Sequence, residues 1–299
     1  MTSFSSPVMD ATRARLAARF GAAVEPWWER LPSLVEELSA RWELGLGEPV
    51  GRGNTSLVMR CSRADGRPAV LKLAPETSLA LAEAWALRSW GPSGRVPAVY
   101  EADAALGAVL LEAIPGERTL LDSGRVPGAG EVAVLIGALH DAGEPALRDG
   151  VVTLAERVEF IFGHWIERHG RNDAVVRLVP VSRLERGHEL ARELAAADAG
   201  RVLLHGDLHP GNVLDGGAER GLVVIDPRAC VGDPAFDYVD WVLWGTDDPG
   251  EWKARAGRLG GDRLHDWCRA FAALLAASEV SNGLATPGRT EALLAEGAS

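Results

Sequence analysis

Three oxygen-bearing side chains near residue 210 have the types and spacing that a magnesium phosphate site requires. Asp207 and, five positions later, Asn212 lie in one polar loop, and Asp226 ends the apolar run that follows a Gly216-Gly217 turn. Two carboxylates and an amide oxygen are hard ligands, which suit Mg²⁺ with part of its water shell kept. Phosphoryl transfer from ATP needs such a metal and a residue that takes the proton of the attacking hydroxyl. The pattern therefore predicts phosphotransfer, with Asn212 and Asp226 on Mg²⁺ and Asp207 as the catalytic base.

A single Asp-containing hairpin would not indicate a catalytic site, because Asp and Asn are common in turns. Here the spacing from Asp207 to Asn212 matches the kinase catalytic loop, and Asp226 lies where a metal-binding strand should end. The two features together favour phosphotransfer over an ordinary turn.

The segment that follows Trp42 predicts a small antiparallel sheet that would hold a nucleotide. Short apolar runs alternate with turns, and Asp65-Gly66 between two of them is a strong hairpin signal. The loop between the first two expected strands would let backbone N–H groups approach phosphate oxygens. Its candidate nucleotide-binding residues are Gly51, Gly53, Asn54, Thr55 and Ser56. A G-x-G pattern alone is weak, and an ordinary hairpin loop would also explain it.

Lys72 supports the nucleotide interpretation because it lies inside the apolar strand V-L-K-L, where an unpaired ammonium would be costly. The apolar spacing of residues 77–90 predicts a helix with Glu83 in its middle. A strand lysine paired with a glutamate on the next helix can hold the α- and β-phosphates of ATP. Glu83 is the expected partner, and Glu76 is the alternative.

Helical spacing of apolar residues also predicts helices elsewhere along the chain. Residues 1 to about 40 form a helical segment in which Trp27 and Trp28 are expected to pack onto the main body. Further helices are expected over residues 131–140, 154–167 and 174–194, with another short one near the C-terminus.

The motifs H-G-D-L-H-P-G-N, V-I-D-P and V-G-D-P-A-F-D-Y-V-D-W resemble those of the aminoglycoside phosphotransferase family, a branch of the protein-kinase-like fold. The runs R-W-E-L, L-R-S-W-G and I-D-P-R are similar to the streptomycin 6-kinase group, which includes hydroxyurea-resistance kinases. The resemblance spans roughly residues 27–244. Its motifs are more specific for phosphotransfer than for the acceptor.

This resemblance implies an α+β, protein-kinase-like fold with two lobes. Residues 1–114 would form the N-terminal helices and the nucleotide-covering sheet, and residues 115–299 a mainly helical lobe with the catalytic loop. In the family a hinge binds the adenine edge through its backbone, which implies contacts from Glu112, Ala113 and Ile114. ATP and Mg²⁺ would be the cofactors. Streptomycin is the leading acceptor, which would confer antibiotic resistance, and hydroxyurea, other aminoglycosides or a metabolite remain open.

Carboxylates and indoles that follow the catalytic hairpin could bind a cationic acceptor. Asp240, Trp241 and Trp244 are the candidates, because guanidinium groups such as those of streptomycin bind well to carboxylates and indole faces. Two other carboxylates have simpler explanations. Asp233, which precedes a proline, is expected to cap a helix, and Asp237 to bond the backbone of the catalytic loop.

Two departures from protein kinases favour a small-molecule kinase that is constitutively active. Gly206 replaces the arginine of the H-R-D motif, and no A-P-E segment follows Asp226. The alternative from another class is a pseudokinase that binds a nucleotide as a regulatory module. Retention of Lys72, Asp207, Asn212 and Asp226 together disfavours that alternative.

Composition limits the partners and the compartment. The net charge of −11 argues against binding to nucleic acid or to anionic membrane surfaces, and it is compatible with a cationic substrate. The three cysteines form no C-x-x-C pair, so neither a zinc site nor a disulfide framework is expected. The sequence shows no signal peptide and no apolar run of membrane-spanning length, so a cytoplasmic protein is expected. It does not indicate an oligomeric state.

Overall fold

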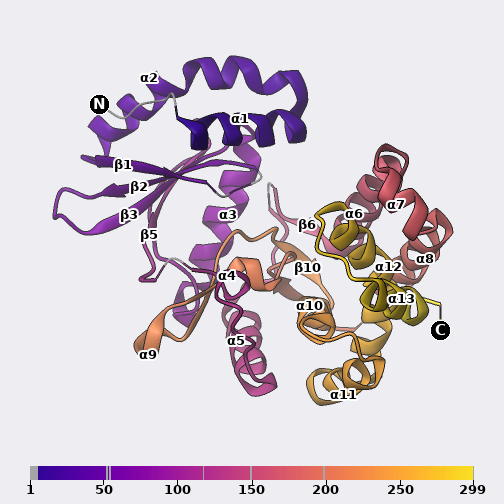
Figure 1. Ribbon diagram of the computed structural model, residues 1–299. Coiled ribbons are helices and arrows are strands. Elements are labelled where there is room, and N and C mark those ends of the chain that lie inside the picture. The colour runs from indigo at the N-terminus through magenta and orange to yellow at the C-terminus, as the bar shows by residue number, and fades with distance from the viewer. Residues whose placement is uncertain are drawn as a thin grey trace. The chain divides into compact units, whose positions relative to one another are not determined.

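The computed structural model (Figure 1) describes residues 6–51, 53, 55–116, 118–148, 150–197 and 199–298. These residues divide into two compact units, which are described separately here. Unit 1 comprises Met1–Glu117 and Gly216–Val223, and unit 2 comprises Arg118–Asp215 and Val224–Ser299. An antiparallel sheet in unit 1 and a mainly helical unit 2 confirm the predicted α+β class.

Unit 1 is built on a five-stranded sheet in the order β1-β2-β3-β5-β4, in which every neighbouring pair is antiparallel. Its strands are β1 (Gly45–Val50), β2 (Leu57–Ser62), β3 (Pro68–Leu73), β4 (Val99–Asp103) and β5 (Ala108–Glu112). Lys72 on the central strand β3 lies opposite Val58 on β2 and Val109 on β5. The helix α3 (Thr77–Trp90) follows β3, at the bounds that its apolar spacing predicts.

Two N-terminal helices, α1 (Pro7–Phe20) and α2 (Glu25–Arg41), cover one side of this sheet (Figure 1). Leu31 and Leu38 of α2 share one buried cluster with Met59 and Leu71 of the sheet. Burial of each such side chain contributes about 1.5–3 kcal/mol, so the helices belong to the core of unit 1. The partly buried Trp27 and Trp28 pack against the same cluster, as expected from the sequence.

Unit 2 is mainly helical. Its helices are α4 (Leu120–Ser123), α5 (Ala129–Ala142), α6 (Leu154–Arg168), α7 (Asp173–Leu178), α8 (Val181–Ala196), α10 (Val239–Leu243), α11 (Pro249–Leu259), α12 (Gly261–Ser281) and α13 (Pro287–Glu296). The buried core gathers around α12, where Trp267 and Phe271 contact Phe236 and Phe162 in edge-to-face geometry. Gly187 lets α8 approach α12 closely, because a Cβ there would lie 2.4 Å from the carbonyl oxygen of Ala270.

Short strands frame the predicted catalytic loop, which contains Asp207 and Asn212. The strand β10 (Cys230–Gly232) pairs in parallel with β6 (Val152–Thr153) and antiparallel with β7 (Val202–Leu204), and the loop begins where β7 ends. The strands β8 (Val213–Asp215) and β9 (Leu222–Val224) form a two-stranded sheet. Both small sheets therefore border, along the chain, the loop with Asp207 and Asn212 and the segment that leads into Asp226.

Two local expectations were wrong. The predicted helix over residues 174–194 is interrupted at Val179 and Pro180, so α7 and α8 are separate helices. A proline lacks the N–H that would continue the helix and disfavours a helical residue before it. The predicted turn at Gly216 and Gly217 is longer than expected and contains the short helix α9 (Gly217–Arg220). None of the helices in the described ranges combines the length and the apolar character needed to cross a bilayer.

Candidate active site

Lys72 and Glu83 form the ion pair that the sequence predicts. Lys72 Nζ lies 2.6 Å from Glu83 Oε1, and the two side chains are only 9% and 10% exposed. The pair joins the central strand β3 to the middle of α3, so both partners are carried by regular elements. The alternative partner, Glu76, instead accepts a hydrogen bond from Ser78 at the start of α3. This geometry fixes the direction of a nearly buried ammonium.

Glu83→Gln should weaken both the fold of unit 1 and the hold on a nucleotide. The amide keeps an acceptor but removes the charge that compensates Lys72, so we expect a loss of about 1–2 kcal/mol in the free energy of unfolding. The KM for ATP should rise. Urea denaturation and initial-rate kinetics measure the two effects, and Glu37→Gln, on the exposed face of α2, is the control. An unchanged KM would contradict a role of the pair in binding phosphate.

The glycine loop between β1 and β2 is contacted by the first helix. Gly53 has a φ of 105°, which favours glycine, and its carbonyl oxygen accepts a hydrogen bond from Arg15 Nε of α1 at 3.4 Å. Arg15 is held in turn by Thr12, whose hydroxyl accepts from Nη2 at 2.9 Å. Gly51, Thr55 and Ser56 belong to the same loop, whereas Asn54 lies outside the described residues.

The expected adenine-binding segment begins at the end of β5. The carboxylate of Glu112 accepts from the backbone N–H of Ala98 at 3.0 Å and from Arg220 Nη1 at 2.5 Å. Its side chain therefore has a structural partner on each oxygen. Any contact of Glu112, Ala113 and Ile114 with a purine would come from their backbone, as the resemblance implies.

The segment that leads into Asp226 lies beside Asn212 in unit 2. Asn212 Nδ2 donates to the carbonyl oxygen of Asp207 at 2.8 Å, so its amide nitrogen is used within the loop. The N–H of Ile225, which directly precedes Asp226, donates to the carbonyl oxygen of Asn212 at 2.9 Å. The ring of His205 contacts the carbonyl oxygen of Ile225 at 3.0 Å. This network ties the backbone of Asn212 to the segment that leads into Asp226.

The two expected ligands, an amide oxygen and a carboxylate, are of the kind that Mg²⁺ takes in proteins. Within the described ranges, no group of three or more His, Cys, Asp or Glu side chains is arranged to hold a metal ion. Mg²⁺ usually takes one or two protein oxygens and completes its shell with water and substrate phosphates. Asp226 has a φ of 57°, which is uncommon for a residue other than glycine and typical of functional sites. The three cysteines are free and buried, so none of them forms a disulfide.

The carboxylate of Asp237 bonds the backbone of the catalytic loop, as the sequence predicts. The carboxylate is fully buried and accepts from the N–H groups of His205 at 2.8 Å and Gly206 at 3.0 Å. His140 Nε2 of α5 lies 3.1 Å from the same carboxylate. Asp233 acts as the predicted cap, because it accepts from the N–H of Ala235 at 3.0 Å.

The backbone conformation and the close neighbours of residue 206 require glycine at this position. Its φ is 76°, and a Cβ at this position would lie 2.2 Å from the carbonyl oxygen of Arg228. The sequence motif therefore has glycine where protein kinases have arginine because the backbone of the segment after Asp226 passes directly beside it. The N–H of Arg228 donates to the carbonyl oxygen of His205 at 2.8 Å, which closes this contact.

We expect Gly206→Ala to cost about 2–4 kcal/mol of folding free energy, because it combines a left-handed backbone with a clash against main-chain atoms. Gly217→Ala is the control, since Gly217 also has a positive φ but no neighbour within 4 Å of an added Cβ. Thermal and urea unfolding measure the difference. Equal losses in the two variants would show that the close approach to Arg228 contributes nothing.

Asp207 lies among positive groups that keep it ionised. Burial raises the pKa of its carboxyl, but nearby His209, Arg157 and Arg228 outweigh this effect, so the pKa lies below the usual value. The side chain is 43% exposed, which leaves it accessible to a substrate. Arg157, on α6, is missing from the sequence-based site. It is 50 positions from Asp207, and no motif marks it.

The expected acceptor residues have different environments. Trp241 is only 4% exposed and packs edge-to-face on Trp244, so it is a core residue and not the expected acceptor contact. Asp240 and Trp244 are partly exposed. Burial raises the pKa of Asp240, and the carboxylates of Asp207, Asp237 and Glu279 raise it further, against the effect of His209. A cation would relieve this crowding of carboxyl groups.

The segments around Asp240 are held by α13. Arg289 of α13 forms an ion pair with Glu279 of α12, with its Nε 2.8 Å from both carboxylate oxygens. The same guanidinium donates to the carbonyl oxygen of Thr246, which lies just beyond α10. We call this arrangement the Arg289 clamp.

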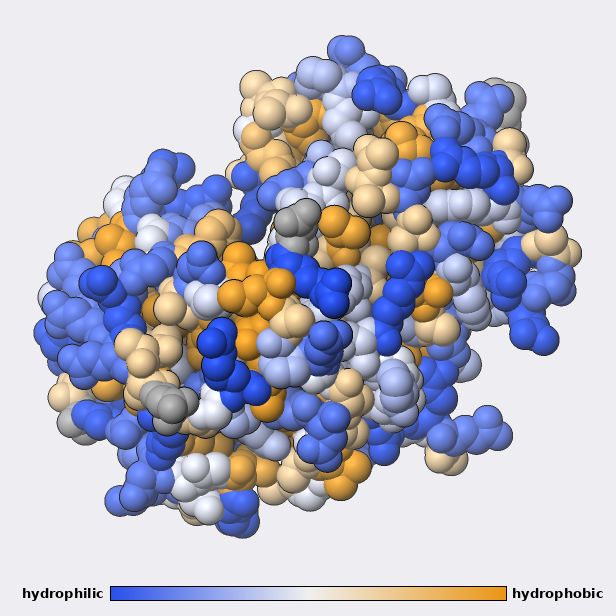
Figure 2. All heavy atoms as spheres, turned by 180° about the vertical axis from the view of Figure 1, so that it is seen from behind, coloured by the Kyte–Doolittle hydropathy of each residue, from blue (hydrophilic) through white to orange (hydrophobic). Residues whose placement is uncertain are grey.

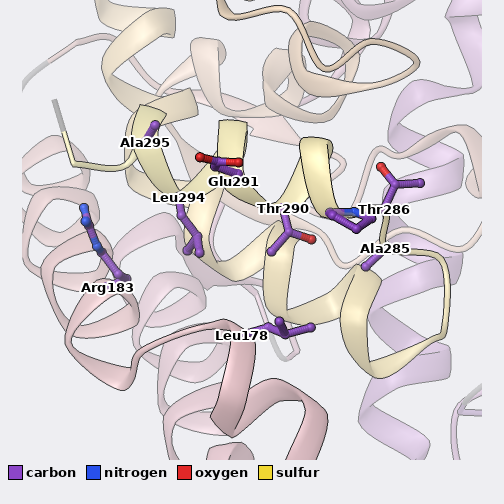
Figure 3. Close-up of a pocket in the computed structure, with 9 residues that line it drawn as sticks. Leu178, Arg183, Ala285, Thr286, Thr290, Glu291, Leu294 and Ala295 are labelled. Atoms are coloured by element: carbon purple, nitrogen blue, oxygen red, sulfur yellow. The ribbon is translucent and has the colours of Figure 1, made fainter.

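A separate cavity of about 500 Å³ lies near the C-terminal end of unit 2 (Figure 3). Leu178 and Arg183 come from α7 and α8, and Thr290, Glu291 and Leu294 come from α13. The cavity contains none of the residues selected from the sequence.

The molecular face drawn in Figure 2 is mostly hydrophilic with scattered hydrophobic residues, as expected for an acidic, charged chain.

Comparisons with known proteins identify the family of the chain. Residues 41–283 match the family described as aminoglycoside/hydroxyurea antibiotic resistance kinase. A hydroxyurea phosphotransferase of Kitasatospora aureofaciens is 35% identical over 241 residues, which cover 80% of this chain and 66% of that protein. A streptomycin 6-kinase of Streptomyces glaucescens is 35% identical over 228 residues, which cover 75% of this chain and 70% of that protein. The chain thus spans about two thirds of the length of these relatives.

Solved structures show the same fold at low sequence identity. The choline kinase LicA from Streptococcus pneumoniae superposes with a TM-score of 0.61 at 16% identity, covering 90% of this chain and 99% of that chain. LicA is also known in complex with AMP, and that structure superposes with a TM-score of 0.60.

Proposed function

Because the chain belongs to the aminoglycoside/hydroxyurea antibiotic resistance kinase family, we propose that it transfers a phosphoryl group from ATP to a hydroxyl group of a small molecule. The observation that carries this proposal is the catalytic loop. Its internal bonds join Asn212 to Asp207 and to the segment that leads into Asp226, and the carboxyl of Asp207 has a lowered pKa and is partly exposed.

Each polar residue of the site has a role in this proposal. Lys72, oriented by Glu83, would bind the α- and β-phosphates, with the loop at Gly51 and Gly53 covering them. The oxygen of Asn212 and the carboxylate of Asp226 would hold Mg²⁺, which would neutralise the phosphate charge.

Asp207 would act as the general base of the reaction. It would orient the acceptor hydroxyl and take its proton, and the products would be ADP and a phosphate ester. A cytoplasmic site of action, where ATP is available, is part of the proposal.

A cationic aminoglycoside of the streptomycin type is the acceptor that the site supports best. Burial raises the pKa of Asp240, and the carboxylates of Asp207, Asp237 and Glu279 raise it further, so a bound positive charge would be favourable there. Guanidinium groups match carboxylates in geometry as well as in charge. The streptomycin 6-kinase relative supports the same acceptor. Hydroxyurea is the second candidate, because a hydroxyurea phosphotransferase matches at the same identity.

The decisive experiment measures ADP release by the purified protein with ATP, Mg²⁺ and either streptomycin or hydroxyurea, followed by mass spectrometry of the product. Growth of a susceptible host carrying the gene on streptomycin tests the same activity in cells. Absence of turnover with both acceptors and with a panel of aminoglycosides and simple alcohols would favour a nucleotide-binding module without catalysis.

Asp240→Asn distinguishes the two acceptors. It should raise the KM for cationic streptomycin about 10-fold, because one charge-assisted contact is worth about 1.5–3 kcal/mol before screening, and leave the KM for neutral hydroxyurea nearly unchanged. Asp247→Asn, just beyond Thr246 in an exposed segment, is the control. Equal changes for both acceptors would contradict charge recognition by Asp240.

A further inference from the structure

A buried arginine from a distant helix lies against the catalytic loop. Arg157 Nε donates to the carbonyl oxygen of Gly206 at 3.2 Å, and its Nη2 lies 3.7 Å from Asp207 Oδ1. The Arg157 side chain is only 13% exposed. None of the roles proposed above uses this residue, although its guanidinium faces the carboxylate of Asp207.

The guanidinium is carried by a rigid part of α6. The helix begins with a capping box in which Thr153 and Glu156 satisfy each other's backbone N–H groups, directly before Arg157. Leu154 is buried beside Gly232 of β10, where a Cβ would lie 2.4 Å from that of Leu154. Close packing at this turn leaves the backbone of Arg157 little freedom.

Arg157 and Asn212 together flank the carboxylate of Asp207. Asp207 Oδ1 faces Arg157 at 3.7 Å, and Oδ2 lies 3.5 Å from Asn212 Nδ2. The distances are long for hydrogen bonds, so the carboxylate is guided by charge and remains able to bind a hydroxyl group. With one neighbour on each side, rotation of the carboxylate away from the acceptor is opposed.

We propose that Arg157 is a positioning residue that holds the Asp207 carboxylate in the orientation needed to receive the acceptor hydroxyl. It acts through Asp207 and through the carbonyl of Gly206, so it sets the geometry of the loop rather than the affinity for ATP. The inference rests on the proposed function, because it assumes that Asp207 is the base. Its distinctive consequence is an effect on kcat without an effect on nucleotide binding.

The test compares Arg157→Ala, Arg157→Lys and the wild-type protein in ADP-release kinetics. Arg157→Ala should lower kcat about 10–10²-fold, the scale of a misplaced catalytic group, and keep the KM for ATP within about twofold. Arg157→Lys should recover part of kcat, because it restores the charge but only one point of contact. Millimolar guanidinium chloride should recover part of the activity of Arg157→Ala by occupying the vacated space.

Arg192→Ala is the matched control, because Arg192 pairs with Glu159 of α6 at 2.8 Å on an exposed face. It should leave kcat unchanged. A kcat of Arg157→Ala within twofold of wild type would overturn the inference, and so would a lowered kcat that neither lysine nor guanidinium restores. If Arg157→Ala does not fold, Arg157→Lys provides the test. Full wild-type turnover of Arg157→Lys would overturn the inference, because lysine cannot make both contacts of the guanidinium.

Failure of the inference can be separated from failure of the proposed function with one more variant. An inactive Asp207→Asn together with a fully active Arg157→Ala would leave Asp207 as the base and reject the role of Arg157. Full activity of Asp207→Asn would instead reject Asp207 as the base, and absence of ADP release by the wild-type protein with every acceptor would reject the proposed function.

Discussion

Asp207→Asn is expected to keep nucleotide affinity and to lose turnover by about 10²–10⁴-fold, the usual contribution of a general base. This loss corresponds to roughly 3–5 kcal/mol of barrier at 1.36 kcal/mol per decade. The amide has nearly the same shape as the carboxylate, so the loop that Asn212 and Ile225 hold together should persist. The variant cannot take the proton of the acceptor. Kinetics of ADP release and calorimetric titration with ADP and Mg²⁺ measure the two quantities separately.

Asp215→Asn is the matched control for this variant. Asp215 ends β8, close to the catalytic loop in the chain, and is 46% exposed beside Arg125. Its replacement should leave kcat unchanged. Wild-type turnover in Asp207→Asn, or an equal loss in Asp215→Asn, would contradict the assignment of Asp207 as the base.

Asp237→Ala should produce the largest loss of stability, about 3–5 kcal/mol, because it leaves polar groups in the interior without their partner. Two backbone N–H groups of the catalytic loop and the ring of His140 all contact this carboxylate. The same change should disturb the position of Asp207 and lower kcat. Urea denaturation gives the stability, and Asp237→Asn, which keeps one acceptor oxygen, should lie between the alanine variant and wild type. Asp141→Asn, an exposed position at the end of α5, is the control.

The contribution of Asp237 also predicts a pH dependence. Burial alone would raise the pKa of this carboxyl, but the contacts with His140 and the backbone of Gly206 outweigh burial and lower it. The unfolded chain therefore binds the proton more readily than the folded one, and stability rises with pH between the two pKa values. The stabilisation should be complete above about pH 4, near the unfolded value, and should be lost as the pH falls through the folded pKa. A difference between wild type and Asp237→Ala that grows on acidification would contradict this sign.

The parts of the site that sequence alone could predict are those marked by a local pattern. Lys72 stands out because a charge inside an apolar strand needs a partner, and Glu83 lies at the position of the next helix that can supply one. The spacing of Asp207 and Asn212 is similarly a property of one loop. Even the role of Asp237 followed from a short motif, and its bonds to the loop backbone are present.

The parts that could not be predicted depend on contacts between distant segments. Nothing in the sequence near Arg157 indicates that α6 passes beside the catalytic loop, because that approach is set by the packing of Leu154 against β10. The burial of Trp241 was equally hidden, since an adjacent carboxylate and indole give no sign of which one faces the core. The helix break at Pro180 was visible in the sequence, but continuous apolar spacing across it suggested a single helix.

The Arg289 clamp has a consequence for how acceptor preference can diverge among relatives. The helix that supplies Arg289 begins at Pro287, after residue 283, where the match to the family ends. It nevertheless contacts Glu279 of α12 and the backbone of Thr246, which follows the helix α10 that carries Asp240. Substitutions in α13 are therefore expected to change the acceptor preference of the protein and to leave Lys72, Asp207 and Asn212 in place.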